Sequence, residues 1–388
     1  MPPRVHDVVI VGGGPVGCAA AAALADTGLS VAVLEAQTAG NRAPDSRTLA
    51  LSWNSKLILE RLKAWPDTAR PTPILAIHVS HRGRFGRARL SAADLQLPAL
   101  GYVLRYSDAY DALLARTLSL GVEYRDGFKV NDIRPGQPVS EVSGTTAQGS
   151  ETVRARLVVI ADGGAALTHL ATRSVREHDY EQAAVVGLAR PDRAHGNLAY
   201  ERFTPAGPIA LLPCEDEFAF VWTCTPAQAA SLSKLDDENF LAGLRDAFGD
   251  RAGRFISTRL RSSFPLVMRV AGEQAEAGVV LLGNASQTLH PIAGQGFNLG
   301  LRDAWDLADL VRSIPADELG SHSMTSRFRA QRRMDRTSGI VATHGLAKLF
   351  SNDLIPLAAG RGVGLSLLDT LAPLKRALMR RMIFGPGR

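Results

Sequence analysis

Three glycines near the start of the chain have the spacing of a phosphate-binding turn. Gly12, Gly14 and Gly17 form the pattern Gly-x-Gly-x-x-Gly, and Pro15 follows the second glycine. In this pattern the first glycine allows a tight turn, the second lets a pyrophosphate approach the main chain, and the third lets a helix pack closely on a strand. The N-terminus of that helix offers N–H groups and a partial positive charge to the phosphates. These four residues are predicted to bind a dinucleotide.

An acidic residue is the second part of this pattern. Residues 29–34 form an apolar run that predicts a strand, and Glu35 follows it directly. A carboxylate at the end of the second strand can accept hydrogen bonds from both hydroxyls of a ribose. Glu35 is therefore predicted to bind the cofactor, with a surface acid at a strand end as the alternative. These residues predict a dinucleotide but do not separate FAD from NAD.

Two later segments carry further candidate residues. Residues 157–161 predict an apolar strand that ends in Asp162 and Gly163, a turn signal. Residues 279–282 predict another strand, which is followed by Gly283 and Asn284 and then by a loop with His290 and Pro291. A helix with apolar residues at helical spacing is expected to start near Phe297. The turn before it and its first residues complete the candidate site: Gly294, Gln295, Gly296, Phe297 and Asn298.

These residues require a fold that brings distant segments together. Residues 7–11 predict a buried parallel strand, and residues 18–25 predict a helix of small side chains. The uncharged stretch 8–25 has a targeting or membrane segment as its alternative. The glycines interrupt any continuous helix there, so we predict the strand–turn–helix unit of a Rossmann-like α/β domain.

The three motifs, in this order, resemble the group A flavin-dependent aromatic monooxygenases, which share the fold of para-hydroxybenzoate hydroxylase. The resemblance runs from about residue 5 to residue 350. In that family the glycine motif and the acid hold the ADP part of FAD, and an Asp-Gly pair lies near the pyrophosphate. A Gly-Asp pair holds the ribitol, and the next loop and helix hold the flavin ring. The resemblance therefore implies FAD as the cofactor of this chain.

The sequence departs from the family pattern at two positions, and two arginines match further positions of that pattern. Asn284 stands where the family has Asp, and Gln287 stands where many members have His. Asparagine can still hydrogen-bond a ribitol hydroxyl, but without the charge. Arg47 and Arg105 match family positions that contact FAD, and Arg47 could bind the pyrophosphate as a bidentate donor. A surface guanidinium is the alternative for Arg47, and the residues after Arg105 differ from the family pattern.

The segments 199–208 and 283–303 resemble the ubiquinone-biosynthesis branch of the family, and within it the hydroxylases of 2-polyprenyl-6-methoxyphenol. The resemblance implies a monooxygenase that hydroxylates the ring of a polyprenylated phenol with O2, through a flavin C4a-hydroperoxide. NAD(P)H is expected as a transient reductant, because the chain has no second dinucleotide-binding motif. The alternatives are a reductase or halogenase of the same fold that acts on a lipid, or a non-enzymatic prenyl-binding protein.

No catalytic base can be assigned from the sequence. His290 is a weak candidate for a proton relay, and a structural residue that fixes the loop at Pro291 is the alternative. Tyr102 and Tyr200 are candidate partners of a phenol. The candidate walls of a substrate pocket are apolar, with core packing as the alternative for each: Phe203, Leu211, Phe220, Trp222, Phe264 and Leu266.

The motifs are spread along the chain, so the FAD-binding domain must be discontinuous. We assign it to residues 1–70, 103–177 and 266–345, with a mostly antiparallel substrate domain formed by residues 71–102 and 178–265. Residues 346–388 form a helical tail. Within it, a basic amphipathic helix over residues 365–382 carries Lys375, Arg376, Arg380 and Arg381 opposite its leucines. It is expected to dock on an anionic membrane or a partner of a biosynthetic complex, with a packed cap helix as the alternative.

Composition narrows the classes of partner. The formal net charge is +6, and the basic residues cluster in residues 78–89 and 375–388. Neither cluster has the interleaved aromatic residues of a single-strand-binding surface, so nucleic acid is not expected. Three cysteines without a CxxC pair favour a reducing compartment and suggest no metal site. The expected location is the cytoplasm, with peripheral association at the inner membrane.

Overall fold

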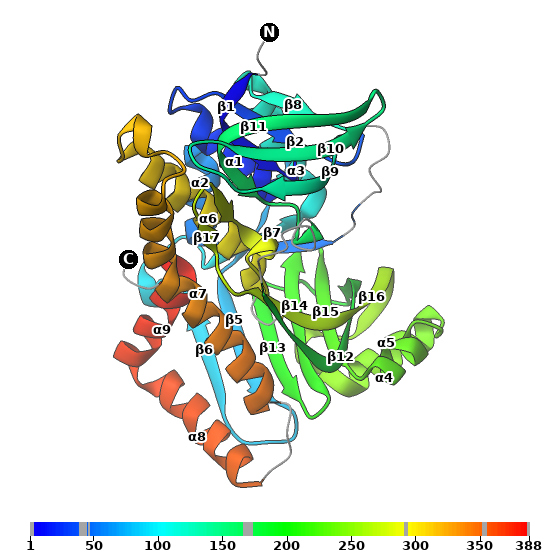
Figure 1. The fold of residues 1–388 in the computed structure, drawn as a ribbon. Helices are drawn as coiled ribbons and strands as arrows, with labels where there is room; N and C mark the ends of the chain where they lie inside the picture. Colours follow the sequence, from blue (N-terminus) through cyan, green and yellow to red (C-terminus); the bar gives the residue numbers. More distant parts are fainter. Residues whose placement is uncertain are drawn as a thin grey trace.

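The computed structural model describes residues 4–38, 45, 47–165, 174–290, 294–350 and 355–385. The described residues form an α/β fold, as predicted. Figure 1 shows one sheet near the N-terminus, at the top of the view, and a second sheet below it. Helices α6 (Gln295–Arg312) and α7 (His322–Phe350) pack against each other beside both sheets.

The first sheet is parallel at its centre. Strand β1 lies between β11 and β2, and the parallel pairing continues to β18 on one side and to β8 on the other. The antiparallel strands β9 and β10 extend β11 into a hairpin, and β17 pairs with β18. The strands of this sheet are β1 (Val5–Val11), β2 (Val31–Leu34), β8 (Glu123–Arg125), β9 (Lys129–Arg134), β10 (Ser140–Thr146), β11 (Gly149–Ile160), β17 (Ala275–Glu276) and β18 (Val279–Leu281).

Apolar layers cover both faces of this sheet, which is why its central strands are apolar toward their carboxyl ends, at residues 8–11 of β1 and 157–160 of β11. Helix α1 (Pro15–Ala25) lies on one face and is buried from Cys18 to Leu24. Its small side chains let it pack against α3 (Tyr106–Ser119) and α6. The β9–β10 hairpin contributes apolar side chains to the layer on the other face.

The second sheet is mostly antiparallel, as predicted; β13 and β5 are its parallel pair. The predicted strands within residues 184–189, 209–212 and 218–223 are confirmed as parts of β12, β14 and β15. In spatial order the strands are β19 (Gln287–Thr288), β16 (Phe255–Ala271), β12 (Val175–Pro191), β15 (Glu217–Cys224), β14 (Gly207–Cys214), β13 (Leu198–Thr204), β5 (Ala76–His81) and β6 (Arg87–Ser91).

Smaller elements join the two sheets and cover the second one. A short sheet of β3 (Thr48–Ser52), β7 (Gly101–Arg105) and β4 (Thr72–Ile74) lies beside α2 (Trp53–Arg61). Helices α4 (Pro226–Leu232) and α5 (Asp237–Phe248) cover the outer face of the second sheet. Strands β12 and β16 run across the predicted domain boundaries at residues 177 and 265, and the division into domains stays a prediction.

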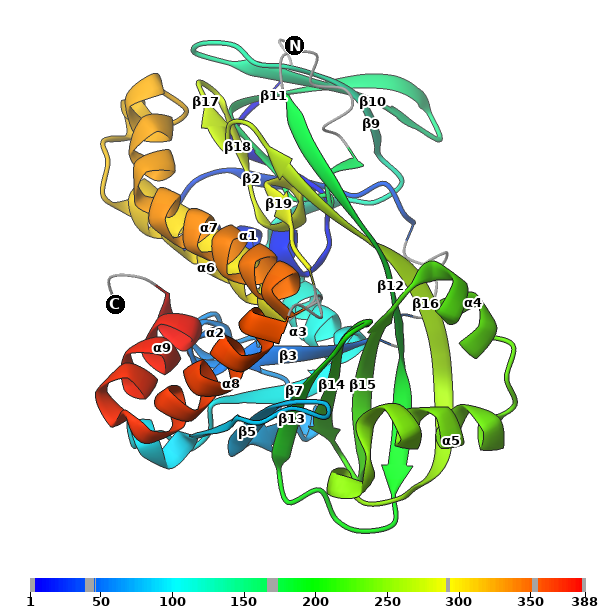
Figure 2. The same cartoon turned by 90° about the horizontal axis from the view of Figure 1, so that it is seen from below.

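The tail differs from the prediction. One helix over residues 365–382 is wrong, because α8 (Ile355–Thr370) ends before Leu371 and α9 (Ala372–Phe384) begins after it. Pro373 explains the break: it has no N–H group to donate to the carbonyl oxygen of Asp369, and in a continuous helix its ring would clash with that carbonyl. Helix α8 packs on β5 and β6 at the edge of the second sheet. Figure 2 shows α9 next to α8 and close to α2.

Candidate active site

The parallel sheet brings the motifs to one edge, although more than 270 residues separate the first from the last. Val11 pairs with Ile160 and with Leu34, and Ile160 pairs with Leu281. Each of these residues is at or next to the carboxyl end of its strand, and each is followed by a motif. Ligands of open α/β sheets bind at this edge.

The three glycines of the first motif meet different surroundings. A Cβ atom on Gly12 would lie 2.6 Å from the Cα of Asp162, and one on Gly17 would lie 1.9 Å from the carbonyl oxygen of Gly12. These two glycines allow close packing of the turn. A Cβ atom on Gly14 would have no other atom within 4 Å, although Gly14 lines the cavity described below. Gly14 is therefore the glycine that keeps space open.

Glu35 binds the glycine turn itself. Its Oε2 accepts a hydrogen bond of 2.6 Å from the N–H of Gly13, and its Oε1 accepts one of 2.9 Å from the N–H of Gln37. Each carboxylate oxygen has a second lone pair, and Glu35 also lines the cavity. The side chain can therefore hold the turn and still accept from a ribose.

The second motif lines the cavity, and buried groups fix the third. Asp162 and Gly163 line the cavity directly after β11. The N–H of Gly283 donates to Asp303 of α6, whose other carboxylate oxygen accepts from Arg332 of α7 at 2.7 Å. Burial raises the pKa of Asp303 and the charge of Arg332 opposes that shift. This network fixes the position of the Gly283–Asn284 turn relative to α6.

The first turn of α6 points its main chain at the cavity. The helix begins at Gln295 after Gly294, whose φ of 58° lies in the left-handed region, and no side chain caps it. An α-helix leaves the N–H groups of its first turn without intrahelical partners. Gly296 and Phe297 therefore present N–H groups, and the helix dipole adds partial positive charge there.

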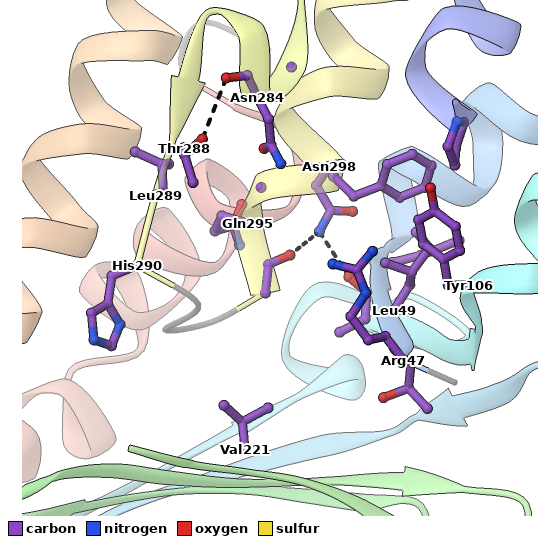
Figure 3. A pocket seen from close by; sticks show the side chains of 18 of the residues that line it. Arg47, Leu49, Tyr106, Val221, Asn284, Thr288, Leu289, His290, Gln295 and Asn298 are labelled. Carbon is purple, nitrogen blue, oxygen red and sulfur yellow. Dashed lines mark hydrogen bonds between the residues drawn. The ribbon is translucent and has the colours of Figure 1, made fainter. Parts of the chain in front are cut away.

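The side chain of Asn298 forms four hydrogen bonds within the protein. Its Oδ1 accepts from the N–H of Ser52 and from the hydroxyl of Ser55, and its Nδ2 donates to the carbonyl oxygens of Ala50 and Gly294 (Figure 3). These four bonds leave little capacity for a ligand. Asn298 instead ties the start of α6 to β3 and α2, and so positions the N–H groups of the first turn.

The two arginines lie in different places. Arg47 lines the cavity, where it forms a bidentate pair with Asp45 and lies 5.1 Å from the ring centroid of Tyr106. Arg105 pairs with Glu215 at 2.8 Å and does not line the cavity. Its contact with FAD stays a prediction without support from this geometry. Pro291 lies outside the described residues.

His290 lies in the wall of the cavity, and its ring packs edge-on against Tyr180 with 5.0 Å between the centroids. Burial lowers the pKa of His290 to about 4. The imidazole is therefore neutral at physiological pH. A neutral imidazole can still accept a proton at one nitrogen and donate one from the other, so the proton relay and the structural role both stay predictions.

The cavity joins the sheet edge to an apolar compartment. Its volume is about 1200 Å³, larger than the roughly 300–1,000 Å³ typical of a site for one drug-sized ligand. Of the predicted wall residues, Phe203, Phe220, Phe264 and Leu266 line it. Leu211 and Trp222 do not line it and pack in the core under α4 and α5, where Phe220 contributes as well.

The predicted phenol partners are not placed to act. Tyr102 packs between Trp53 and Trp65 outside the lining. Tyr200 borders the cavity, but its ring packs against Phe218 and Phe248 on the outer face of the second sheet. Sequence reasoning missed the neighbour of Tyr200, Glu201, which also lines the cavity. The sequence does contain a signal for Glu201. In a strand, alternate residues share a face, so Glu201 lies on the same face as Ala199 and Phe203.

The tail closes the apolar compartment, which sequence reasoning also missed. Side chains of α8 and α9 line the cavity opposite the second sheet: Leu365, Leu368, Leu378, Met379, Met382 and Ile383. Leu365 packs on Phe203 and Ala88, and Met379 packs on Leu90 and Leu100. The tail therefore packs on the second sheet, as the alternative of a packed cap helix predicts.

The residues of this edge fit FAD. The open space at Gly14, the acid at the end of β2 and the uncapped N-termini of α1 and α6 all face one cavity. These groups suit a pyrophosphate, a ribose and a ring that gains negative charge on reduction. The apolar compartment lies next to the position where the motif order places that ring.

Comparisons with known proteins also indicate an FAD-binding protein. The model of the FAD binding domain family matches residues 5–333, so the chain belongs to this family of FAD-binding proteins. It is 34% identical over 391 residues to the ubiquinone hydroxylase UbiL of Rhodospirillum rubrum, which covers 97% of this chain and 89% of the relative. It is 29% identical to the 3-demethoxyubiquinol 3-hydroxylase of Escherichia coli, with 96% and 97% covered.

The fold is that of flavin-dependent monooxygenases. The structure of the p-nitrophenol 4-monooxygenase PnpA of Pseudomonas putida superposes with a TM-score of 0.79 at 19% sequence identity, with 100% of both chains covered. The flavin-dependent brominase Bmp2 superposes with a TM-score of 0.77 at 15% identity. At these identities the likeness shows the fold alone, and the choice of reaction depends on the site.

Proposed function

We propose that the chain is an FAD-dependent, NAD(P)H-using monooxygenase that hydroxylates the ring of a polyprenylated phenol in ubiquinone biosynthesis. One observation carries the proposal: a single cavity runs from the FAD-binding edge of the first sheet to apolar walls from the second sheet and the tail. The names of the relatives point to the same reaction class. Within that class, the sequence segments favour a 2-polyprenyl-6-methoxyphenol as the substrate.

The chain's own residues hold, orient and shield the reactants. The turn at Gly14 and the N-terminus of α1 would hold the pyrophosphate of FAD. Glu35 would bind its ribose, and the Gly283–Asn284 turn would bind its ribitol. When bound, FAD supplies the transfer of electrons from NAD(P)H to O2. The N–H groups of Gly296 and Phe297 stabilise the negative charge of the reduced ring. The apolar side chains of the second sheet and the tail exclude water and bind the prenyl chain.

Product formation tests the reaction class. The purified protein with FAD, NAD(P)H and a short-chain 2-prenylphenol should release a hydroxylated phenol, and NAD(P)H oxidation should rise when the phenol is added. Oxidation of NAD(P)H without hydroxylated product would indicate a reductase. A halogenated product that requires halide would indicate the reaction named for Bmp2. A colourless protein that binds the prenylphenol would indicate a non-enzymatic binding protein.

We also propose that the enzyme is cytoplasmic and docks on the anionic surface of the inner membrane. In the described part of the chain, no helix is long and apolar enough to span a membrane. The docking surface is defined here as the tail patch. Its exposed apolar residues are Phe85, Val363, Leu367, Leu371, Leu374 and Leu378, and its exposed basic residues are Arg82, Arg84, Arg87, Arg376, Arg380 and Arg381.

The fold supports the tail patch by joining the two basic clusters of the sequence. A Cβ atom on Gly86 would lie 2.4 Å from the carbonyl oxygen of Gly362, so the β5–β6 turn touches α8. Phe85 lies in this turn with 76% of its surface exposed. Leu378 borders both the tail patch and the cavity, which gives a membrane-bound substrate a short path to the site. Lys375 is an exception, because it pairs with Asp94 at 3.3 Å and is mostly buried.

Liposome binding tests the docking proposal. Each basic residue near an anionic surface contributes roughly 1 kcal/mol, so replacing Arg376, Arg380 and Arg381 with Gln should weaken binding to anionic vesicles by about 100-fold at low salt. The matched control replaces three exposed arginines elsewhere with Gln: Arg134, Arg254 and Arg327. Equal loss in both triple variants would contradict the tail patch, and loss of binding only to a purified acidic protein would replace the membrane by a protein partner.

A further inference from the structure

Glu201 places one carboxyl group in an otherwise apolar part of the cavity wall. It lies on β13, where it pairs with Val79 of β5 and Ala210 of β14. The same row continues through Val221 of β15 to Val186 of β12. Residues opposite each other on neighbouring strands share a face, and these five residues line the cavity. Figure 3 shows Val221 of this row below the first turn of α6, on the far side of the cavity from Asn298 and Gln295.

This carboxyl group has no partner within the described protein. Its Oε1 is buried without a hydrogen bond, and Glu201 takes part in no ion pair between described residues. A buried carboxyl without a partner is costly. Burial raises the pKa of Glu201 to about 7, so both protonation states are populated at physiological pH. A ligand with a hydroxyl group would supply the missing partner.

Among the described residues, the charged and titratable groups near Glu201 form no hydrogen bond or ion pair with it. On β13 itself, Arg202 faces the outer side of the sheet, where it lies 5.9 Å from the ring centroid of Phe248. On β5, His78 lies on that outer side beside Tyr200, and His81 shares the face of Glu201 two positions further along. On the tail, Leu365 and Leu368 pack toward this face, and Arg361 is buried on α8 one turn before Leu365. Glu201 is thus the carboxyl group that a ring in the apolar compartment can reach.

We propose that Glu201 binds the ring hydroxyl of the phenolic substrate and accepts its proton during hydroxylation. The inference rests on the proposed function, which supplies O2 as oxidant and NAD(P)H as reductant. The phenol O–H bond breaks and a carboxyl O–H bond forms, which makes the ring carbons more electron-rich. One oxygen atom of O2 then joins the ring as a hydroxyl, and the other is reduced by the two electrons from NAD(P)H and leaves as water. The displaced ring hydrogen leaves as a proton, and Glu201 returns its proton to the original oxygen.

A single polar anchor also explains how a greasy substrate finds one orientation. Apolar walls bind the prenyl chain without fixing the angle of the ring, whereas a hydrogen bond to a carboxylate fixes one edge of it. A hydrogen bond to a charged group changes affinity by roughly 10- to 100-fold. The orientation of the ring, and with it the carbon that is hydroxylated, would follow from the position of Glu201.

Binding of a phenol and of its methyl ether to the FAD-loaded enzyme tests the inference. The probes are a 2-alkylphenol with a ten-carbon chain and the corresponding anisole, and the readout is the change of the flavin absorbance on binding. The wild type should bind the phenol about 10- to 100-fold more tightly than the ether, and this preference should increase as the pH rises through 7. Glu201→Leu should abolish the preference, and Glu201→Gln should leave a small preference that does not change with pH.

The controls separate this role from a structural one. Glu141→Gln, in the β9–β10 hairpin, and His81→Gln should keep both the preference and its pH dependence. Equal weakening of phenol and ether in Glu201→Leu, or an unchanged preference, would overturn the inference. A wild type that shows the preference but forms no hydroxylated product would contradict the proposed function instead. The wild type could hydroxylate the phenol while Glu201→Gln keeps the preference for phenol over ether and its pH dependence. That result would contradict the role of Glu201 and leave the proposed function intact.

Discussion

Replacing Gly14 with valine separates binding of the cofactor from folding of the turn. Gly14 has φ −69° and ψ 180°, an extended conformation that valine readily adopts. A Cβ atom there meets no other atom within 4 Å. The variant should therefore fold with a melting temperature close to that of the wild type. The side chain would occupy the space where the pyrophosphate approaches the N-terminus of α1.

The expected loss follows from the hydrogen bonds that would be lost. Each hydrogen bond from the main chain to a charged phosphate contributes about 1.5–3 kcal/mol, so the loss of two raises the Kd for FAD at least about 100-fold. Titration of the apoprotein with FAD, followed by flavin fluorescence, measures this directly. The protein purified from cells should be colourless.

Two other glycines provide the matched controls. Gly17→Ala should lower the melting temperature, because its Cβ atom would lie 1.9 Å from the carbonyl oxygen of Gly12. Gly243→Ala in α5 should retain FAD and be slightly more stable, since its neighbours lie at 3.8 Å or beyond. A Gly14→Val variant that binds FAD within twofold of the wild type would refute the placement of the pyrophosphate.

Three further predictions follow from the buried groups of the site. Glu35→Ala should weaken FAD binding by about 10-fold or more in the same titration, because the N–H of Gly13 loses its acceptor and the ribose loses its partner. Asp303→Asn should reduce the free energy of unfolding by about 3–5 kcal/mol in a denaturant titration, because it leaves Arg332 buried without one of its charged partners; no change would rule out the network at Gly283. Since burial lowers the pKa of His290 to about 4, the unfolded chain binds the additional proton, and the stability due to neutral His290 is lost as the pH falls from about 6.5 to 4. His290→Gln should reduce this acid sensitivity in melts across that range and leave the pH profile of hydroxylation above pH 6 unchanged.

The cofactor edge could be predicted from sequence because its signals are local. Each motif follows a short apolar run, and a parallel sheet places the carboxyl ends of its strands together whatever the distance along the chain. The glycines, Glu35 and Asp162 therefore lie where their types indicated. Asn298 shows the limit: its position was correct, but its side-chain bonds go to β3 and α2, which only the folded chain brings near.

The substrate side depends on contacts between distant segments. The ring of Tyr200 packs on the outer face of the second sheet and Glu201 lies on the inner face, and alternation alone does not say which face is which. The tail shows the same limit. Pro373 was visible as a helix breaker, but the packing of Leu365 and Met379 against the second sheet depends on tertiary structure. Arg105 pairs with Glu215, a partner 110 residues away that no local pattern indicates.

The most direct test of the proposed function follows the oxygen atoms. The FAD-loaded protein is supplied with NAD(P)H, a short-chain 2-prenylphenol and O2 labelled with ¹⁸O, and the product is analysed by mass spectrometry. A monooxygenase places one labelled atom in the hydroxylated ring and releases the other as water, so the product mass should rise by one labelled oxygen. Label that appears only in water or hydrogen peroxide, with the phenol recovered unchanged, would contradict the account.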